Sequence, residues 1–173
     1  GDGVVANVLL NKSGMKGGGS VQITIAWGLA VLLPVIIFAD ASGALFNPAL
    51  SISMAVDGTI PWSFVPVYIV GQVVGGFFCG IAGLLQAGSH RKKYSTQPLN
   101  FLSEAIGTFI LMFSLKGIGN AAGISGGMDK IFVFAVIVSI GMSLGGLTGY
   151  AINPARDFGP RLAHWILPIR GKG

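Results

Sequence analysis

Long apolar segments dominate the chain, and they predict helices that cross a membrane. A helix needs about 20 residues, at roughly 1.5 Å each, to span the hydrocarbon core of a bilayer. Four segments reach this length, and the connectors between them are rich in Gly, Ser, Asn and charged residues, as loops are. The predicted spans are residues 21–39, 64–87, 99–119 and 131–150.

Two further segments are too short to span a bilayer and resemble each other. Residues 42–56 read SGALFNPALSISMAV, and residues 148–162 read TGYAINPARDFGPRL. When the two are overlaid at one constant offset, a Gly and the triplet Asn-Pro-Ala coincide, so that Asn47 pairs with Asn153. An Asn-Pro pair stops a preceding helix and starts another. The segments therefore form an internal repeat of a loop followed by a short helix.

An odd number of predicted spans separates the two short segments, so the repeats enter the membrane from opposite faces. Inverted repeats with broken helices build solute sites near the midplane of a membrane. Non-helical backbone at that depth is tolerated only where protein buries it or where it lines a water-filled cavity. We expect one all-α membrane domain over residues 1–173, with a first repeat over about 1–87, a connector at 88–98 and a second repeat over about 99–173. Its two re-entrant half-helices would meet at the midplane.

The Asn-Pro-Ala triplets carry the first candidate chemistry. Pro at the first turn of a helix loses only an N–H that would have been unpaired, and Asn caps the helix while keeping its amide donors free. Two half-helices that meet end to end bring two positive dipole ends to one level, which attracts a hydroxyl or water oxygen and repels a cation. A single Asn-Pro is most often a turn, whereas two copies in inverted context indicate a paired site. The motif residues are Asn47, Pro48, Ala49, Asn153, Pro154 and Ala155.

Composition supports a membrane protein and argues against several other classes. Hydrophobic residues make up 52% of the chain, charged residues 10%, and the mean hydropathy is +0.75. The net charge is +5, but the basic residues lie in short connectors and form no continuous stripe, so no nucleic-acid surface is expected. Cys79 has no cysteine partner, and His90 and His164 stand apart, so neither a metal site nor a cofactor is expected. No set of nucleophile, base and orienting group can be assembled, which argues against an enzyme.

The segments SGALFNPA and GYAINPARDFGPRLAHW resemble the major intrinsic protein (aquaporin) family, and the resemblance extends over nearly the whole chain. Asp157, directly after Asn-Pro-Ala-Arg, resembles the aquaglyceroporin branch, which includes the glycerol uptake facilitators. The family has six spans, so the chain is expected to lack the first and last. The resemblance implies a homotetramer in the plasma membrane that passes glycerol, similar small neutral solutes and some water through the lipid bilayer, and excludes ions and protons.

The resemblance also implies a selectivity filter of Trp27, Gly141, Tyr150 and Arg156. An arginine fork can hold two solute hydroxyls and repel cations, while the two aromatic faces suit a carbon backbone. Gly141 leaves room that a larger side chain would fill. Other interpretations stay open: Trp27 and Tyr150 as interfacial belt residues, and Arg156 as a snorkelling or loop arginine.

The same resemblance implies that backbone carbonyls form a row of hydrogen-bond acceptors, here called the ladder, along the channel. Glu104, an acid inside a predicted span, would support it by accepting from loop backbone, with a proton relay as the alternative. Asp157 is expected to anchor its half-helix. Two departures leave the preferred solute open, because Tyr150 replaces a common Phe and Leu45 a common His. The ladder residues would be Gly43, Ala44, Leu45, Gly149, Tyr150 and Ala151.

Small residues within the predicted spans indicate close helix packing. Gly71, Gly75, Gly76 and Gly80 share one predicted span, and Gly141, Gly145 and Gly149 follow another. Three functional alternatives remain beside a glycerol channel. They are a water-selective or urea and weak-acid channel of the same family, an ion-coupled secondary transporter, and a structural membrane protein without transport.

Overall fold

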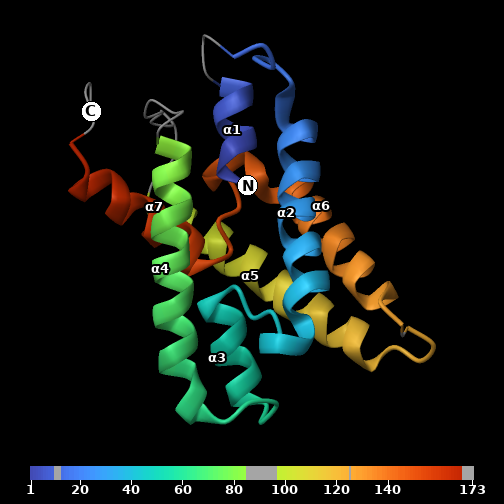
Figure 1. The fold of residues 1–173 in the computed structure, drawn as a ribbon. Helices are drawn as coiled ribbons and strands as arrows, with labels where there is room; N and C mark the ends of the chain where they lie inside the picture. Colours follow the sequence, from blue (N-terminus) through green and yellow to red (C-terminus); the bar gives the residue numbers. More distant parts are fainter. Residues whose placement is uncertain (10–12, 85–96, 125, 169–173) are drawn as a thin grey trace. The chain divides into compact units, whose positions relative to one another are not determined.

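The computed structural model describes residues 1–9, 13–84, 97–124 and 126–168, and every regular element in this part of the chain is a helix (Figure 1). This agrees with the all-α membrane fold expected from the sequence. The elements are α1 (Asp2–Leu9), α2 (Gly19–Ser42), α3 (Pro48–Val56), η1 (Trp62–Phe64), α4 (Val65–Leu84), α5 (Gln97–Asn120), α6 (Met128–Thr148) and α7 (Pro154–Ile166).

Four helices among the described residues are long and apolar enough to cross a membrane, as the sequence predicts. These helices are α2, α4 with the preceding η1, α5 and α6. Pro34 lies inside α2, a position tolerated in membrane helices more readily than in soluble ones. Most of the predicted connector 88–98 lies outside the described residues, and its last two residues, Gln97 and Pro98, already belong to α5. Proline suits this place because the first turn of a helix needs no N–H from it.

The described helices fall into two compact units. The first, here called the half-helix unit, comprises Gly1–Gly19, Leu45–Tyr94 and Asn153–Gly173, and so contains α1, α3, η1, α4 and α7. The second, the three-helix unit, comprises Ser20–Ala44 and Ser95–Ile152, with α2, α5 and α6. Each unit therefore combines segments from the first and second halves of the sequence.

Helix α4 is the centre of the half-helix unit and contacts α1, α3 and α7 (Figure 1). Glycines permit the close approach of α7. A Cβ on Gly76 would collide with the carbonyl oxygen of Ala155, and one on Gly80 would lie 2.5 Å from the Cα of Pro160. From the other side, a Cβ on Gly159 would lie 2.5 Å from the carbonyl carbon of Gly76. The packing role predicted for Gly76 and Gly80 is confirmed.

The opposite face of α4 is apolar and open. A Cβ on Gly71 or Gly75 would meet no other described atom within 4 Å, so close helix packing accounts for neither glycine in this part of the chain. Val67, Val70 and Val74 are also exposed there. Exposed valines on a helix of this length are expected where lipid or another apolar surface covers the protein.

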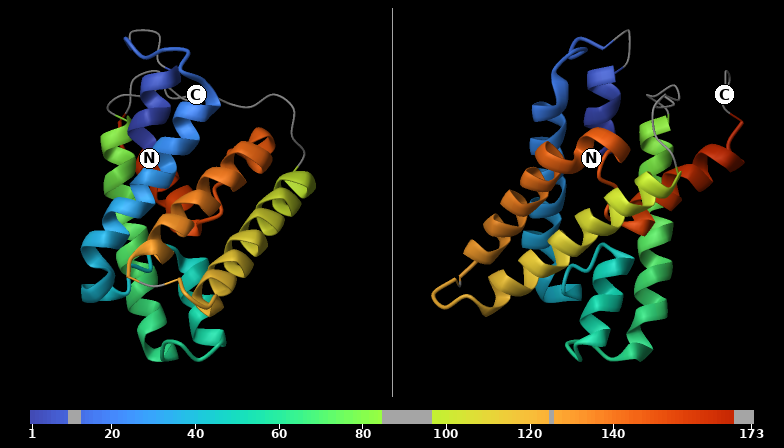
Figure 2. Two further views of the ribbon diagram at one scale, coloured as in Figure 1. Left: turned by 90° about the vertical axis from the view of Figure 1, so that its right-hand side faces the viewer. Right: turned by 180° about the vertical axis from the view of Figure 1, so that it is seen from behind.

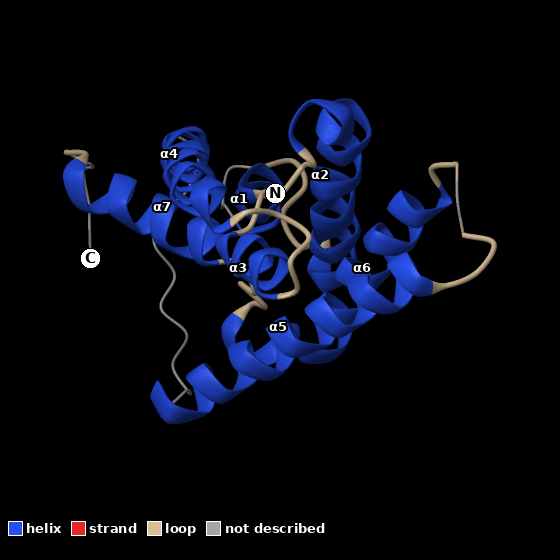
Figure 3. Cartoon of the chain, turned by 90° about the horizontal axis from the view of Figure 1, so that it is seen from below, coloured by secondary structure: helices blue, strands red, loops and turns tan. Residues whose placement is uncertain are grey.

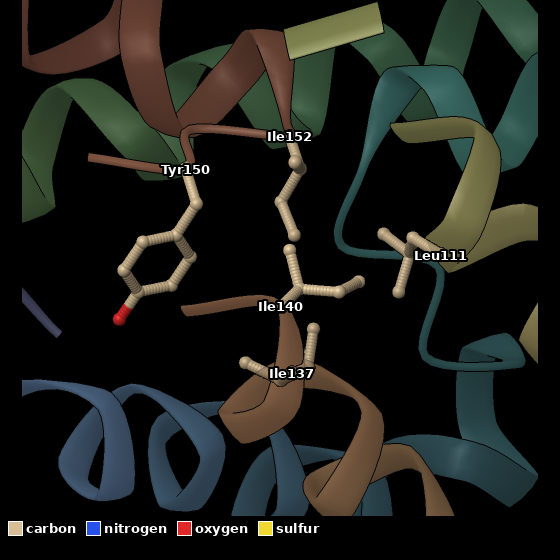
Figure 4. Close-up of a cluster of buried hydrophobic side chains, with 5 residues drawn as sticks. All are labelled: Leu111, Ile137, Ile140, Tyr150 and Ile152. Atoms are coloured by element: carbon tan, nitrogen blue, oxygen red, sulfur yellow. The ribbon is translucent and has the colours of Figure 1, made fainter. Parts of the chain in front are cut away.

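In the three-helix unit, α5 and α6 lie side by side (Figures 2 and 3). Gly28 lets α2 approach α6, because an added Cβ would lie 2.6 Å from the ring of Phe134. The core of the unit brings together α5, α6 and the loop after α6 (Figure 4). Its buried side chains are Leu111, Ile137, Ile140, Tyr150 and Ile152.

Candidate functional site: two capped half-helices and their loops

Each Asn-Pro-Ala triplet starts a short helix and caps it. Asn47 has an extended backbone, and its Oδ1 accepts a hydrogen bond from the N–H of Ala49 at 2.9 Å. Asn153 does the same for α7, accepting from the N–H groups of Ala155 at 3.1 Å and Arg156 at 3.2 Å. The proline after each Asn occupies the first helical turn. The capping predicted from the sequence is thus confirmed for both half-helices.

The two capped ends meet within the half-helix unit. The side-chain Nδ2 of Asn153 donates a hydrogen bond of 2.9 Å to the carbonyl oxygen of Phe46, the residue directly before Asn47. Helices α3 and α7 are also in contact. The sequence predicted free amide donors, and for Asn153 this is wrong in one respect, since one N–H is used by the first loop. An amide nitrogen carries two hydrogens, so this bond occupies only one of them.

The meeting of these ends has an electrostatic consequence. The N-terminus of a helix carries about half a positive charge from its unpaired N–H groups. Helices α3 and α7, of 9 and 13 residues, bring two such ends together through the Asn153 bond. The pair favours oxygen acceptors such as hydroxyls and water, and it disfavours cations.

In the first loop, between α2 and α3, the backbone takes left-handed conformations. Gly43 has φ of 65° and Ala44 has φ of 50°. A residue other than glycine pays about 1–3 kcal/mol for such a conformation, which persists only where the surroundings hold it. The N–H of Ala44 donates to the Oγ of Ser42 at 3.3 Å. The loop continues into Leu45, whose carbonyl accepts a hydrogen bond from the Nε2 of Gln72.

In the second loop, between α6 and α7, Glu104 holds the backbone. Its carboxylate accepts from the N–H of Ala151 at 2.9 Å and from the N–H of Ile152 at 2.7 Å. Each of these N–H groups shares a planar trans peptide unit with the preceding carbonyl, which points the opposite way. The carbonyls of Tyr150 and Ala151 therefore point away from Glu104. The contact that the sequence predicted between Glu104 and loop backbone is confirmed.

Strain in this second loop matches that in the first. Gly149 ends α6 with φ of 87°, and Tyr150 and Ile152 follow with φ of 43° and 39°. The two hydrogen bonds that the Glu104 carboxylate accepts offset the cost of these conformations, because bonds to a charged acceptor are stronger than neutral ones. Four of the ladder residues expected from the sequence are thus held in left-handed backbone, namely Gly43, Ala44, Gly149 and Tyr150.

The ring of Tyr150 rests against two glycines of α6. A Cβ on Gly141 would lie 2.7 Å from the Cζ of Tyr150, and a Cβ on Gly145 would lie 2.7 Å from its Cδ1. Gly141 also faces the methyl group of Thr24, at 2.6 Å from the added Cβ. Trp27 of α2 packs against the buried cluster that contains Tyr150. Three of the four expected filter residues thus share the three-helix unit.

Arg156, the fourth expected filter residue, lies in the first turn of α7 in the half-helix unit, and its N–H is part of the Asn153 cap. Asp157 follows it and forms a two-point ion pair with Arg161 one turn later. Both Nε and Nη2 of Arg161 donate to the carboxylate at 2.9 Å. The carboxylate of Asp157 is therefore paired within its own helix. Among the described residues, no cluster of His, Cys, Asp and Glu is arranged to hold a metal ion.

Sequence reasoning missed several residues that make contacts in this region. Gln72 and Ser51 contact the first loop, Phe46 accepts from Asn153, and Thr24 faces Gly141. A signal was present for Gln72, since a glutamine in the middle of an apolar span needs a hydrogen-bonding partner. Ser51 stands one turn after Asn47, the place from which a hydroxyl returns to a helix carbonyl.

Comparison with known proteins agrees with this geometry. Residues 2–168 match the family described as Major intrinsic protein. The chain is 47% identical to a probable glycerol uptake facilitator protein of Thermotoga maritima, over 99% of this chain and 80% of that protein. It is 44% identical to glycerol uptake facilitator protein 3 of Lactiplantibacillus plantarum, over 100% and 78%.

A solved structure agrees as well. The X-ray structure of the aquaglyceroporin from Plasmodium falciparum superposes with a TM-score of 0.82 at 26% identity, over 98% of this chain and 77% of that one. The four apolar helices, the paired Asn-Pro-Ala half-helices and these similarities agree with one another. The chain therefore belongs to the major intrinsic protein family, and it is a multi-pass membrane protein.

Proposed function

We propose that this protein is a passive channel for glycerol and other small uncharged solutes, with some water, and that it excludes ions and protons. The observation that carries the proposal is the pair of Asn-capped half-helices joined by the hydrogen bond from Asn153 to Phe46. The names of the relatives, which are glycerol uptake facilitators, support glycerol as the solute. No energy source is needed for such a channel.

The chemistry of a polyol matches the groups along the two loops. A hydroxyl both donates and accepts, so it needs an acceptor and a donor at each step. The carbonyls of Tyr150 and Ala151, oriented by Glu104, supply acceptors. The ends of α3 and α7 supply donors and a positive potential. A cation loses its hydration there and meets a field of its own sign, so it is excluded.

For solute selection we propose the four residues that match the pattern of the family: Trp27, Gly141, Tyr150 and Arg156. The glycine at position 141 supports this choice, because any larger side chain would push against the ring of Tyr150. Aromatic faces and a guanidinium fork suit the carbon and hydroxyl sides of a polyol. We further propose backbone acceptors at Gly43, Ala44, Leu45, Gly149, Tyr150 and Ala151.

The proposal extends to assembly and location. We propose a homotetramer in the plasma membrane, each subunit with its own pore, as the family resemblance implies. Exposed apolar side chains on the spanning helices support a surface covered by lipid or by another subunit; among them are Phe101, Phe109 and Phe113 of α5. Cross-linking in native membranes, read by denaturing gel, tests the tetramer.

Stopped-flow light scattering on proteoliposomes tests the solute. Vesicles containing wild-type protein, the variant Trp27→Ala or the variant Arg156→Ala are mixed with hyperosmotic glycerol, and separately with an impermeant osmolyte that reports water flow. Empty vesicles give the background. We expect fast glycerol uptake by the wild type and an altered ratio of glycerol to water permeability in both variants.

The other outcomes assign other functions. Water flow without glycerol flow identifies a water-selective channel. Faster flow of urea or of a neutral weak acid than of glycerol identifies a urea or weak-acid channel of the same family. Saturable uptake that follows an ion gradient identifies a secondary transporter. No flow of any solute, with intact protein in the vesicles, contradicts the channel and leaves a structural membrane protein.

A further inference from the structure

Gln72 lies on α4, which packs beside α3 in the half-helix unit (Figure 1). Its Nε2 donates to the carbonyl of Leu45 and to the Oγ of Ser51, the second at 2.8 Å. Ser51 is fully buried. The Oγ of Ser51 donates in turn to the carbonyl of Asn47 at 3.2 Å. One side chain from a spanning helix thus reaches the loop before the first Asn-Pro-Ala triplet and, through Ser51, the carbonyl of Asn47 itself.

Chemistry fixes the orientation of this amide. The Leu45 carbonyl is only an acceptor, so the nitrogen of the amide must face it. The Ser51 hydroxyl has already given its proton to Asn47, so it too must accept. A flipped amide would set its oxygen against both groups and make neither bond. The amide oxygen is buried, and no hydrogen-bond partner for it is found in the described part of the chain.

The two loops are consequently held in opposite ways. Glu104 accepts from two backbone N–H groups of the second loop, so the carbonyls of Tyr150 and Ala151 point away from it. Gln72 donates to a backbone carbonyl of the first loop, which occupies one lone pair of Leu45. The second loop is thus held through its N–H groups and the first through a carbonyl.

We propose that Gln72 is a positioning residue of the channel, which acts through the carbonyls of Leu45 and Asn47 and makes the first loop more selective for polyols. The proposal rests on the proposed function. A polyol carries hydroxyls at fixed spacing and must meet acceptors at matching places, whereas a water molecule reorients freely. Loss of the Gln72 donors lets the Leu45 carbonyl turn, which costs glycerol more than water.

The test compares glycerol and water permeability in proteoliposomes for the wild type, Gln72→Met and Gln72→Glu. Methionine keeps the length of the side chain without donors, and a glutamate carboxylate is an acceptor only. We expect glycerol permeability to fall about fivefold in both variants, as for one lost hydrogen bond, with a smaller change for water. Val70→Met, an exposed position on the same helix, is the matched control and keeps the wild-type ratio.

A second variant, Ser51→Ala, tests the proposal even where the Gln72 variants do not fold. Ser51→Ala removes the bridge to Asn47 but leaves the Leu45 bond, so we expect a smaller fall in glycerol permeability, of about twofold. Wild-type glycerol permeability in both Gln72→Met and Ser51→Ala overturns the proposal. Equal losses of glycerol and water flow, together with a lower unfolding temperature, also overturn it, because they indicate a merely structural role. A wild-type protein that passes no glycerol contradicts the proposed function instead, whatever the variants do.

Discussion

At the scale of single residues, Glu104 shows how one side chain controls a stretch of backbone. It is a half-buried acid on a spanning helix, where an unpaired charge is costly. Its two oxygens receive two adjacent N–H groups, so its bonding is matched to the loop that it faces. The same bonds turn the carbonyls of Tyr150 and Ala151 away from Glu104. Stability and acceptor geometry therefore depend on the same carboxylate.

We predict that Glu104→Ala lowers the free energy of unfolding by about 2–4 kcal/mol, because two N–H groups lose a charged acceptor. Glu104→Gln should cost less, since one amide oxygen still accepts while the amide nitrogen faces the other N–H. Thermal unfolding in detergent micelles measures both. The control is Leu102→Ala, an exposed site on the same helix, which should change little. Equal stability of Glu104→Ala and wild type would contradict the prediction.

Asn153 combines two functions that one substitution separates. Aspartate caps a helix as well as asparagine does, but it has no donor for the Phe46 carbonyl. We predict that Asn153→Asp keeps α7 folded, as judged by circular dichroism, and lowers glycerol permeability about tenfold through the lost bond and the added negative charge. The variant should also admit cations, measured as potassium leak from vesicles. Unchanged glycerol flow without any leak would refute this role.

Local rules found part of this chemistry in the sequence and missed the rest. The caps at Asn47 and Asn153 follow from Asn-Pro alone, because capping involves neighbours two or three positions away. Gln72 and Phe46 were missed, because their partners lie 27 and 107 positions away in the chain. Contacts at such separations depend on packing that no local pattern encodes.

At the scale of elements, the junction between α4 and α7 depends on glycine at selected positions. Gly76, Gly80 and Gly159 lie where two backbones nearly touch. Gly75 precedes Gly76 directly, but an added Cβ there would meet nothing within 4 Å among the described residues. The two neighbours form a natural pair for an experiment.

We predict that Gly76→Ala destabilises the protein by about 1–3 kcal/mol, because the new methyl group collides with the backbone of α7. Gly75→Ala should be neutral or stabilise by up to about 1 kcal/mol, since alanine favours helix where space allows. Unfolding midpoints in detergent compare the two variants. A Gly75→Ala variant less stable than Gly76→Ala would contradict the packing.

The spanning elements themselves were predictable from the sequence. Long apolar runs place α2, α5 and α6 within a few residues of their observed bounds, since hydrophobic length alone decides a span. The role of each glycine was less predictable. The spacing is the same for Gly71 and Gly75 as for Gly76 and Gly80, and only the last two meet a partner helix. Spacing gives the face of a helix, but not what covers it.

At the scale of the whole molecule, the proposed channel has a kinetic signature. A pore without a coupled ion should pass glycerol at a rate proportional to its concentration difference, without saturation in the millimolar range. We predict no change in that rate when a proton or sodium gradient or a membrane potential is imposed on the vesicles. Radiolabelled glycerol uptake, with and without ionophores, measures this. Uptake abolished by an ionophore would identify ion coupling instead.

The hydrogen bond from Asn153 to Phe46 also has a consequence for biosynthesis. Its partners are 107 positions apart, so at bacterial or eukaryotic rates of translation the first half-helix leaves the ribosome roughly 5–20 s before the second. The bond from Gln72 to Leu45 spans only 27 positions and can form much earlier. During that interval the nascent first loop has its own glutamine as a partner but lacks the opposing asparagine. Insertion into the membrane therefore passes through a stage with one loop of the pore assembled and the other still being synthesised.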